Sequence, residues 1–367
     1  MGLYVHIPFC QRKCAYCDFY SISSKSLYEN YIAALSKQIK NLSRAYSDRF
    51  FDTIYIGGGT PTILSDQSIK LLLESVFQSF FIDKHAEITI EANPATLDSK
   101  KLETLLAGGI NRLSIGCQSA VDSELETLGR SHTFADFVET YNLARKCGFE
   151  NVSVDLMYAL PDQTLETFKY SLKCVTELSP EHISLYGLKV EPNTLFYKNR
   201  DLLAFPSEDE FCQMYLEAGE YLRSSGYSKY EISNFSKFGY ESRHNMKYWK
   251  LQDYLGLGPG AHSFVNGKRF AYARDVLGYI KAINDDLEPE YSENIIISEN
   301  DMLNEEIMLN MRLSHGYDID GRLTLDTERL ALFEKYGYLI KQGNNVRFTD
   351  TGFLVSNYIL SELTNFD

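Results

Sequence analysis

The sequence lacks an apolar run long enough to form a membrane-spanning helix. Charged residues interrupt each apolar stretch well before the roughly 20 residues that a bilayer requires, although 44% of the 367 residues are hydrophobic. The first residues, Met1 to Pro8, also lack the basic and apolar regions of a signal peptide. We therefore expect a cytoplasmic protein without a spanning segment, for which peripheral membrane association stays open.

Basic residues are fewer than acidic ones. The 36 lysines and arginines are outnumbered by 50 aspartates and glutamates, which gives a net charge of −14. Such a charge disfavours a broad electrostatic contact with the phosphates of nucleic acid. We therefore predict no nucleic-acid partner, while a local basic patch would still suit an anionic ligand.

Cysteine is scarce and unevenly distributed. Three of the seven cysteines crowd into residues 10–17, and Cys117, Cys147, Cys174 and Cys212 stand far apart. A disulfide framework would show a denser pattern in a small secreted chain. The crowded cysteines instead indicate a metal site in a reducing compartment, and the scattered ones suggest small buried residues.

Six short runs rich in Ile, Val, Leu, Tyr and Thr are each followed by a stretch with helical periodicity. Such runs are typical of strands buried on both faces of a parallel sheet. The runs are Leu3–Ile7, Thr53–Ile56, Glu87–Glu91, Arg112–Ile115, Ser153–Met157 and His182–Leu188. The alternation predicts an α/β fold with right-handed crossovers. An open doubly wound sheet and a curled barrel both fit this pattern.

Each of the six runs ends in a polar segment or one rich in glycine and proline, such as Gly57–Pro61 after the second run. In α/β barrels and open α/β sheets, ligands bind at the carboxyl ends of the strands. Successive strands that all contribute polar segments at this edge indicate one shared pocket.

The pattern changes after about residue 240. His244–Trp249 holds the only tryptophan, and the glycine-rich stretch Gly256–His262 follows. We therefore expect two domains, residues 1–240 and residues 241–367.

The end of the second domain has the element order of a winged helix. Its periodicity predicts helices over Asp301–Arg312, Asp326–Tyr336 and Gly352–Leu363, with a hairpin that turns at Gly343–Asn345. No clear basic stripe marks a DNA-binding face, so we expect this α-rich, winged-helix-like domain to pack against the first domain.

Cys10, Cys14 and Cys17 form a Cys-x₃-Cys-x₂-Cys triplet on one loop directly after the first strand. Thiolates are the soft ligands that iron–sulfur clusters and zinc prefer. A closed zinc site needs four ligands, and His6 would have to supply the fourth. Three thiolates on a [4Fe–4S] cubane instead leave one iron open for a ligand with an amine and a carboxylate.

The triplet resembles the signature of the radical S-adenosylmethionine (SAM) superfamily. The resemblance implies a partial (β/α)₆ barrel related to the TIM barrel, with a [4Fe–4S] cluster held by Cys10, Cys14 and Cys17. It also implies that SAM chelates the open iron and is cleaved to a 5′-deoxyadenosyl radical. The resemblance also gives the glycine-rich segment Gly57–Pro61 a role in binding SAM; the alternative interpretation is a tight turn without a ligand role.

Residues further along the chain resemble a narrower group, which contains oxygen-independent coproporphyrinogen III oxidases and HemW-type heme chaperones. The resemblance covers nearly the whole chain. It implies that the SAM site is formed by Tyr4, Tyr16, Gly58, Gly59, Thr60, Glu91, Gln118, Arg130 and Asp155. An arginine is a suitable partner for a carboxylate, whereas acidic side chains accept from ammonium or ribose hydroxyl groups. Taken singly, each has an alternative: Glu91 or Asp155 as a helix cap, and Arg130 as a surface cation.

Two departures favour the chaperone branch over the oxidase branch. The oxidases carry a fourth cysteine two residues after the third, where this chain has Phe19. The oxidases also have a longer segment before the first strand. Both departures argue against oxidative decarboxylation of a porphyrinogen.

The segment His244–Trp249 resembles the His-Asn-x-x-Tyr-Trp motif of HemW-type proteins. Heme needs an axial donor, commonly a neutral imidazole, and aromatic or apolar walls. We predict His244 as the heme ligand, with His262 as a second candidate. The alternative is a hydrogen-bonded core histidine among packed aromatic side chains.

The resemblance implies a protein that binds heme and transfers it to acceptor hemoproteins, for example of a respiratory chain. Radical chemistry would in addition require an electron donor. The alternative function is radical decarboxylation of coproporphyrinogen III, and a radical enzyme with an unrelated substrate also fits, because fold and cofactor do not fix the substrate.

Overall fold

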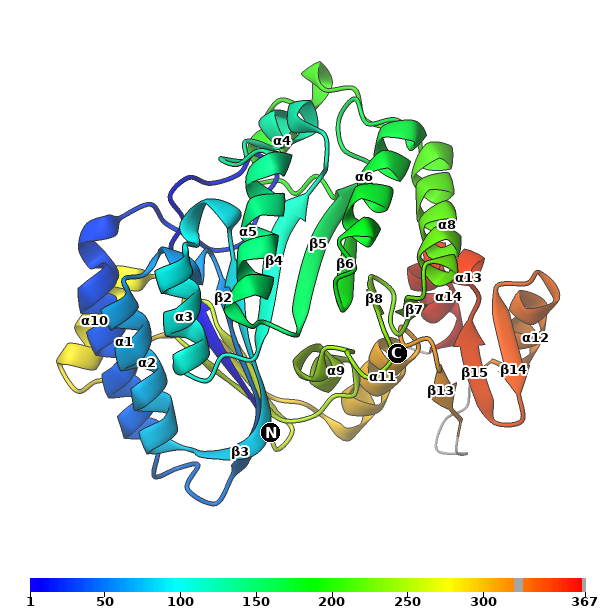
Figure 1. Cartoon of the computed structure of the whole chain (residues 1–367). Coiled ribbons are helices and arrows are strands. Elements are labelled where there is room, and N and C mark those ends of the chain that lie inside the picture. Colours follow the sequence, from blue (N-terminus) through cyan, green and yellow to red (C-terminus); the bar gives the residue numbers. More distant parts are fainter. Residues whose placement is uncertain (320–325, 365–367) are drawn as a thin grey trace.

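The computed structural model describes residues 1–319 and 326–364 (Figure 1). At its centre, six strands pair in parallel and lie side by side in chain order. These strands are β1 (Gly2–Ile7), β2 (Phe50–Gly58), β3 (Phe81–Ala92), β4 (Arg112–Gln118), β5 (Val152–Tyr158) and β6 (His182–Gly187). The predicted α/β fold and all six predicted strands are confirmed.

Further strands extend this sheet at both edges to 12 strands. A short hairpin pairs antiparallel with β6, and β9 pairs in parallel with the other side of β1. The strands are β7 (Ser228–Lys229), β8 (Asn234–Ser236), β9 (Tyr254–Leu257), β10 (His262–Val265), β11 (Lys268–Tyr272) and β12 (Tyr291–Ile296). The first strand of the chain is therefore an inner strand of the sheet.

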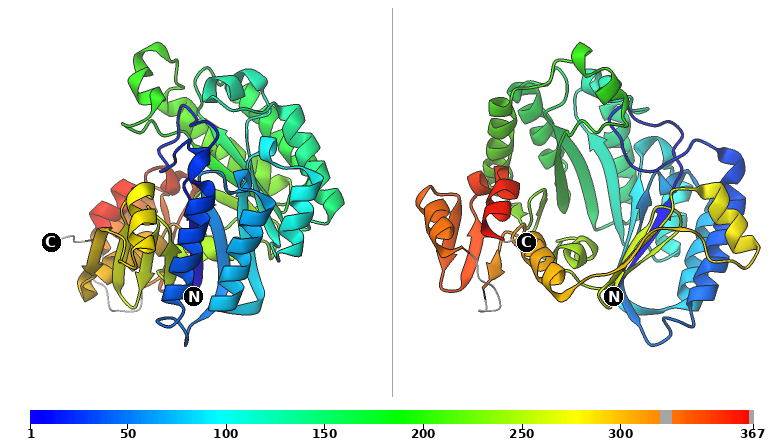
Figure 2. Two further views of the ribbon diagram at one scale, coloured as in Figure 1. Left: turned by 90° about the vertical axis from the view of Figure 1, so that its left-hand side faces the viewer. Right: turned by 180° about the vertical axis from the view of Figure 1, so that it is seen from behind.

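Helices cover the outer face of the curved sheet (Figure 2). In α1, Tyr31, Ile32, Leu35 and Ile39 form the buried stripe that the helical period places on one side. Between β1 and β12, where the structure describes every residue, the chain forms ten α-helices, of which α9 lies on the other face of the sheet. They are α1 (Tyr28–Leu42), α2 (Asp66–Ser79), α3 (Ser99–Ala107), α4 (Asp122–Leu128), α5 (Phe134–Cys147), α6 (Leu165–Glu177), α7 (Leu195–Lys198), α8 (Glu208–Ser224), α9 (Arg243–Trp249) and α10 (Val276–Asn284).

Short 3₁₀ helices occur at the ends of several strands and loops. They are η1 (Lys25–Leu27), η2 (Pro61–Ile63), η3 (Pro94–Thr96) and η4 (Arg200–Leu202). Two of them, η2 and η3, begin with proline, whose fixed φ suits the first position of a helix. They carry the chain away from the carboxyl ends of β2 and β3.

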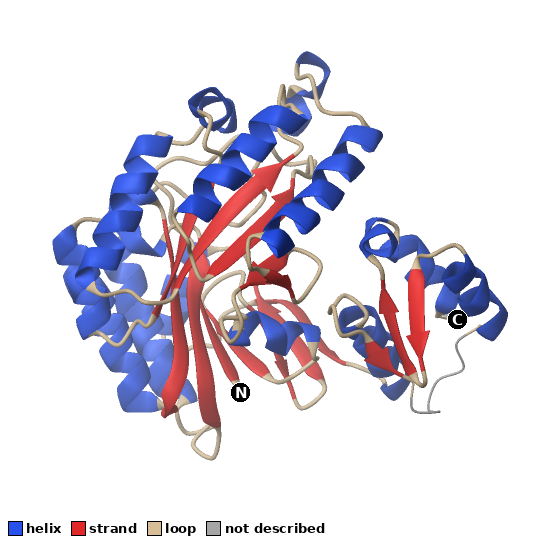
Figure 3. Cartoon of the chain, turned by 45° about the vertical axis from the view of Figure 1, so that its right-hand side comes forward, coloured by secondary structure: helices blue, strands red, loops and turns tan. Residues whose placement is uncertain are grey.

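The C-terminal part forms a smaller unit with its own three-stranded antiparallel sheet, in the order β13-β15-β14 (Figure 3). Its elements are α11 (Glu299–Asn310), β13 (Tyr317–Asp318), α12 (Thr327–Lys335), β14 (Leu339–Gln342), β15 (Asn345–Phe348), α13 (Asp350–Leu354) and α14 (Ser356–Leu363). The predicted hairpin at Gly343–Asn345 is confirmed. The domain division at residue 240 stays a prediction, because β9 to β12 belong to the large sheet.

Helix α9 lies inside the curve of the sheet, at the end where the parallel strands begin (Figure 1). Its first N–H groups, from Arg243 and His244, donate to the carboxylate of Glu87 on β3, each at 3.0 Å. We call the face of the large sheet that α9 approaches the interior face. Within the described residues, no helix is long and apolar enough to cross a membrane.

Candidate functional site

The cysteine loop starts where β1 ends and is anchored on several sides. Cys10 N–H donates to the Ile22 carbonyl, and Ile22 N–H donates back to the Pro8 carbonyl, at 3.2 and 2.8 Å. In the middle of the loop, Ala15 N–H donates to the carbonyl of Leu128, the last residue of α4, at 3.0 Å. These contacts hold the segment between the first and third cysteines at the carboxyl edge of the parallel strands.

Cys10, Cys14 and Cys17 are partly buried free thiols. Thr60, after β2, donates its hydroxyl to Cys10 Sγ at 3.5 Å, and Arg130 Nη1 lies 3.8 Å from Cys14 Sγ. Burial and the neighbouring Cys14 and Cys10 raise the pKa of Cys17 to about 11. A cationic cluster would remove this penalty, because metal ligation displaces thiol protons. The donor set and its surroundings therefore fit a cluster.

The glycine turn after β2 packs directly on the cysteine loop. A Cβ atom at Gly59 would lie 2.5 Å from the Phe9 carbonyl oxygen, and Gly58 has a φ of +109°. The Gly59 and Thr60 N–H groups donate to the carbonyls of Ile7 and Phe9. Only glycine fits at these two positions, so the turn requires glycine already for packing.

Glu91, at the carboxyl end of β3, faces the same turn. Its carboxylate accepts from the Tyr55 hydroxyl at 2.8 Å and from the Gly58 N–H at 3.0 Å. Burial, with the nearby Asp155 carboxylate, raises the pKa of Glu91 to about 7. Asp155 on β5 accepts from the Ser114 hydroxyl at 3.3 Å, and burial raises its pKa as well. The two predicted acidic residues therefore lie in one partly buried polar cluster.

Gln118, Arg130 and Tyr16 form the other side of the site, where the Tyr16 and Arg130 side chains are hydrogen-bonded to each other. Gln118 ends β4 with a φ of +70°, and a Cβ on Gly116 would lie within 3.0 Å of both the Gln118 and Arg130 side chains. Arg130 Nη2 donates to the Gly116 carbonyl at 3.0 Å, whereas its Nε is buried without a partner. An incompletely paired guanidinium suits a ligand carboxylate, which fits the amino-acid part of SAM.

Tyr4 and His6 alternate with buried apolar residues on β1. The Tyr4 hydroxyl and His6 Nδ1 lie 2.9 Å apart, and His6 Nε2 lies 3.1 Å from the Tyr20 carbonyl oxygen. Both ring nitrogens of His6 are thus engaged away from the thiols. In the part of the chain that the structure describes, no three His, Cys, Asp or Glu side chains are placed to hold a single metal ion.

His244 lies apart from the cysteine loop, near the beginnings of the strands. Its ring is fully buried, with Nδ1 at 2.9 Å from Thr53 Oγ1 and Nε2 at 2.8 Å from the Tyr248 hydroxyl. Burial lowers the pKa of His244 to about 3. The imidazole is therefore neutral, as an iron ligand must be, but one of its two hydrogen bonds has to open before it can bind iron.

An aromatic stack, which the sequence did not reveal, connects His244 to residues predicted for the SAM site. Tyr55 on β2 stacks on His244 with a centroid distance of 5.3 Å and on Tyr4 with one of 6.3 Å. Its hydroxyl is the group that donates to Glu91. One feature of the sequence could have indicated this stack: Tyr55 stands between Ile54 and Ile56, so its side chain points to the face of β2 opposite theirs, which is the interior face. The second heme candidate, His262, is an exposed residue on β10, with Nδ1 at 3.6 Å from Glu293.

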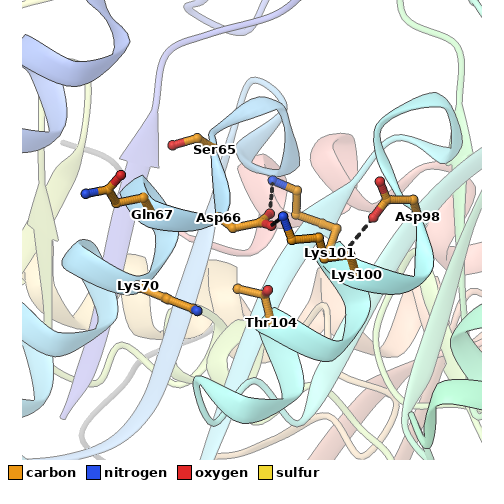
Figure 4. Close-up of a pocket in the computed structure, with 8 residues that line it drawn as sticks. All are labelled: Ser65, Asp66, Gln67, Lys70, Asp98, Lys100, Lys101 and Thr104. Atoms are coloured by element: carbon orange, nitrogen blue, oxygen red, sulfur yellow. Dashed lines mark hydrogen bonds and ion pairs between the residues drawn. The ribbon is translucent and has the colours of Figure 1, made fainter.

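Another hollow lies on the outer surface, away from these residues. It is formed by the beginnings of α2 and α3 (Figure 4). Lys100 and Lys101 are paired there with Asp66, at 3.5 and 2.8 Å. Two of its three lysines thus share one carboxylate within the hollow, and the candidate site remains the carboxyl edge of the parallel strands.

A partial β/α barrel with a three-cysteine loop after its first strand defines the class of radical SAM proteins. Residues 4–175 match the family model described as the radical SAM superfamily. Among solved structures, coproporphyrinogen III oxidase (HemN) from Escherichia coli has a TM-score of 0.86 and 25% identity. That match covers 98% of this chain and 88% of the oxidase chain.

The curated relatives narrow the class. The heme chaperone HemW of Bacillus subtilis is 38% identical over 91% of this chain and 86% of its own length. HemW of Lactococcus lactis is 34% identical over 98% of this chain and 96% of its own length, and HemW of Escherichia coli is 38% identical over 72% of this chain. The chain belongs to the HemW family of heme chaperones within the radical SAM superfamily.

Proposed function

We propose that this protein binds heme and delivers it to acceptor hemoproteins. The observation that carries the proposal is the neutral, buried imidazole of His244, stacked on Tyr55 and hydrogen-bonded to Tyr248 on the interior face. A neutral imidazole among aromatic rings suits heme iron and its macrocycle. The names of the HemW relatives support the same cargo.

In this proposal, Cys10, Cys14 and Cys17 hold a [4Fe–4S] cluster, which supplies the open iron that SAM chelates. Tyr4, Tyr16, Gly58, Gly59, Thr60, Glu91, Gln118, Arg130 and Asp155 surround the cofactor. The chain's own part is to shape this site: Arg130 offers an incompletely paired guanidinium, and Gly58 and Gly59 permit close approach of the backbone. An electron donor is required only if SAM is cleaved.

Radical decarboxylation of coproporphyrinogen III is the second candidate function, and the structural similarity to the oxidase HemN favours it. Phe19 argues against it, because this side chain stands where the oxidases have their fourth cysteine and is 71% exposed.

We further propose a cytoplasmic location, acceptors in a respiratory chain, and a division of the chain into residues 1–240 and 241–367.

The test uses full-length protein reconstituted anaerobically with iron and sulfide. Heme binding is followed by the Soret band, and coproporphyrinogen turnover is assayed on the same sample. We expect heme binding without turnover. Replacing the three loop cysteines by alanine should abolish the cluster absorbance, whereas Cys174→Ala, a matched free cysteine outside the loop, should retain it. Turnover without a heme complex would refute the carrier function.

Variants at His244 and around it test whether this residue ligates the heme iron. His244→Ala should weaken heme binding about tenfold or more, because an iron ligand is lost, whereas the exposed His262→Ala should leave it unchanged. Tyr248→Phe removes the hydroxyl that competes for Nε2 of His244, so it should retain or strengthen heme binding. Equal affinities of the His244→Ala and wild-type proteins would place the iron ligand elsewhere.

A further inference from the structure

The interior face contains an arginine that the site described above does not use. Arg112, the first residue of β4, is 2% exposed and is one of the largest fully buried side chains. Its Nε is buried without a partner, and in residues 1–319 and 326–364 no hydrogen bond or ion pair reaches its guanidinium group. A buried charge without a partner carries a large desolvation cost.

The guanidinium of Arg112 lies among groups from several strands around the interior. Its charge acts on Glu91 and Asp155, on Tyr55, and on His182 and Tyr230. A pair with either acid would be the ordinary arrangement. Among the described residues neither acid lies within ion-pair distance of Arg112, and both accept from other donors.

The two acids and the histidine near Arg112 are engaged by other groups. Glu91 accepts from Tyr55 and the Gly58 N–H, and Asp155 accepts from Ser114. His182 has its Nδ1 at 2.7 Å from Ser153 Oγ and its Nε2 at 2.7 Å from the Tyr230 hydroxyl. The buried Nε–H of Arg112 is thus left without an acceptor beside acids and a histidine that other groups engage.

A second unpaired group lies directly beside Arg112. Thr89 on β3 is its partner in the strand register, and the Thr89 hydroxyl is fully buried without a hydrogen-bond partner. Thr89 lies two residues from both Glu87 and Glu91, so the three side chains share one face of β3. Glu87 contacts α9 and Glu91 contacts Gly58, which identifies this face as the interior face. A guanidinium fork and a hydroxyl donor on adjacent strands match the acceptor geometry of a carboxylate.

Solvent reaches the interior face at the carboxyl edge of the strands. Tyr186 lies on the same face of β6 as Ser184, and it is 41% exposed although it is part of a strand in the large sheet. The interior face is therefore open at the carboxyl edge of the strands, and a ligand reaches Arg112 and Thr89, at 2% and 0% exposure, only after the side chains above them move. Arg112 and Thr89 lie deeper, between the residues of the SAM site and helix α9.

We propose that Arg112 and Thr89 form a carboxylate-binding subsite on the interior face, which receives an acidic side arm of the ligand that enters the barrel. This inference rests on the proposed function, because heme carries two propionates and one of them is the carboxylate assigned to this subsite. The subsite orients the macrocycle in the barrel by holding one edge of it, whereas His244 acts on the iron.

The experiment compares hemin with hemin dimethyl ester, which keeps the iron and the macrocycle but has no free carboxylate. Wild-type protein should bind hemin about tenfold or more tightly than the ester, because hydrogen bonds to a charged group discriminate by about that factor. Arg112→Gln should lose this preference and keep the affinity for the ester. Arg112→Lys, which keeps the charge without the fork, should retain part of the preference.

Thr89→Val keeps the shape of the side chain and removes only the unpaired hydroxyl, so the fold is preserved. It should reduce the preference for hemin severalfold. Thr140→Val, at a buried threonine on α5 whose hydroxyl donates to the Pro94 carbonyl at 3.4 Å, is the control outside the interior face and should not change this preference.

The outcomes separate this inference from the function on which it rests. A preference for hemin that persists in Arg112→Gln and Thr89→Val overturns the subsite while heme carriage stands. If only the arginine variants act and Thr89→Val does not, Arg112 serves the neighbouring acids through its charge, and the subsite is also refuted. A wild-type protein that binds neither compound refutes the proposed function and the subsite with it.

Discussion

Single residues in this chain show how burial alone sets protonation states. Glu231, after β7, is fully buried, and its Oε2 accepts from the Ser233 N–H while Oε1 has no partner. Burial raises the pKa of Glu231 to about 7. The charged form of this side chain is therefore unfavourable in the folded protein, and its effect on stability depends on pH.

Glu231→Gln should raise the free energy of unfolding at pH 8 by about 1–2 kcal/mol and leave it nearly unchanged at pH 4. The folded state binds this proton up to about pH 7, and the unfolded chain releases it near the ordinary glutamate value. Stability from this group is therefore lost as pH rises between these two values. Urea unfolding at several pH values measures the effect, and an equal gain at pH 4 and pH 8 would contradict it.

At the same scale, the sequence predicted the cysteine loop and the residues at the strand ends because their spacing and positions are local features. It did not predict the roles of Arg112 and Tyr55. Whether an arginine inside a strand has a partner depends on which strands face it across the interior, and this is decided only when the sheet curves. Likewise, the sequence motif marked His244 but gave no sign that both ring nitrogens are occupied by Thr53 and Tyr248.

At the scale of elements, the long apolar runs were predicted and the short ones were not. Strands β1 to β6 are continuous enough to read from composition, whereas β9 covers four residues at the start of a glycine-rich stretch. Strands β10 and β11 are joined by a tight turn, and β12 has mostly exposed residues. Such segments form strands because β1 offers a free edge on which β9 can pair, which no local pattern records.

Helix α9 depends on a residue that is distant in sequence. Glu87 accepts from the first two N–H groups of this helix and thereby replaces a local acidic cap. Glu87→Gln should lower the free energy of unfolding by about 1–2 kcal/mol, because a charged acceptor at a helix N-terminus is lost. Urea unfolding measures this loss. The exposed Glu103→Gln on α3 is the control and should cost little; equal effects of both variants would contradict the role of Glu87.

At the scale of the whole molecule, one lysine connects the large sheet to the C-terminal unit. Lys229 on β7 is 7% exposed and lies 2.5 Å from Asp350 at the start of α13. Its ammonium group lies over the rings of Tyr215 and Phe353, at 4.5 and 4.9 Å from their centroids. A partly buried ion pair, whose lysine lies among aromatic rings, therefore joins two parts of the chain that the sequence separates by more than a hundred residues.

Lys229→Met and Asp350→Asn should each destabilise the protein, and the double variant should lose less than the sum. We expect a coupling energy of about 1–3 kcal/mol in a double-mutant cycle measured by urea unfolding. Arg223 also contacts Asp350, at 2.9 Å on a more exposed side, and Arg223→Met provides the matched comparison with a smaller coupling. Additive losses for the Lys229 and Asp350 variants would show that the contact does not couple the two units.

The placement of β1 between β2 and β9 has a consequence for synthesis on the ribosome. Gly2 pairs with Thr53 on one side and with Tyr254 on the other, so one edge of β1 stays unpaired until two thirds of the chain has emerged. The cysteine loop follows this strand immediately, and the nascent barrel is open beside it throughout that time. We therefore expect the three thiols to accept a cluster most readily before β9 has left the ribosome, which arrested nascent chains with residues 254–257 still inside or already outside the exit tunnel can test by their capacity to take up iron and sulfide.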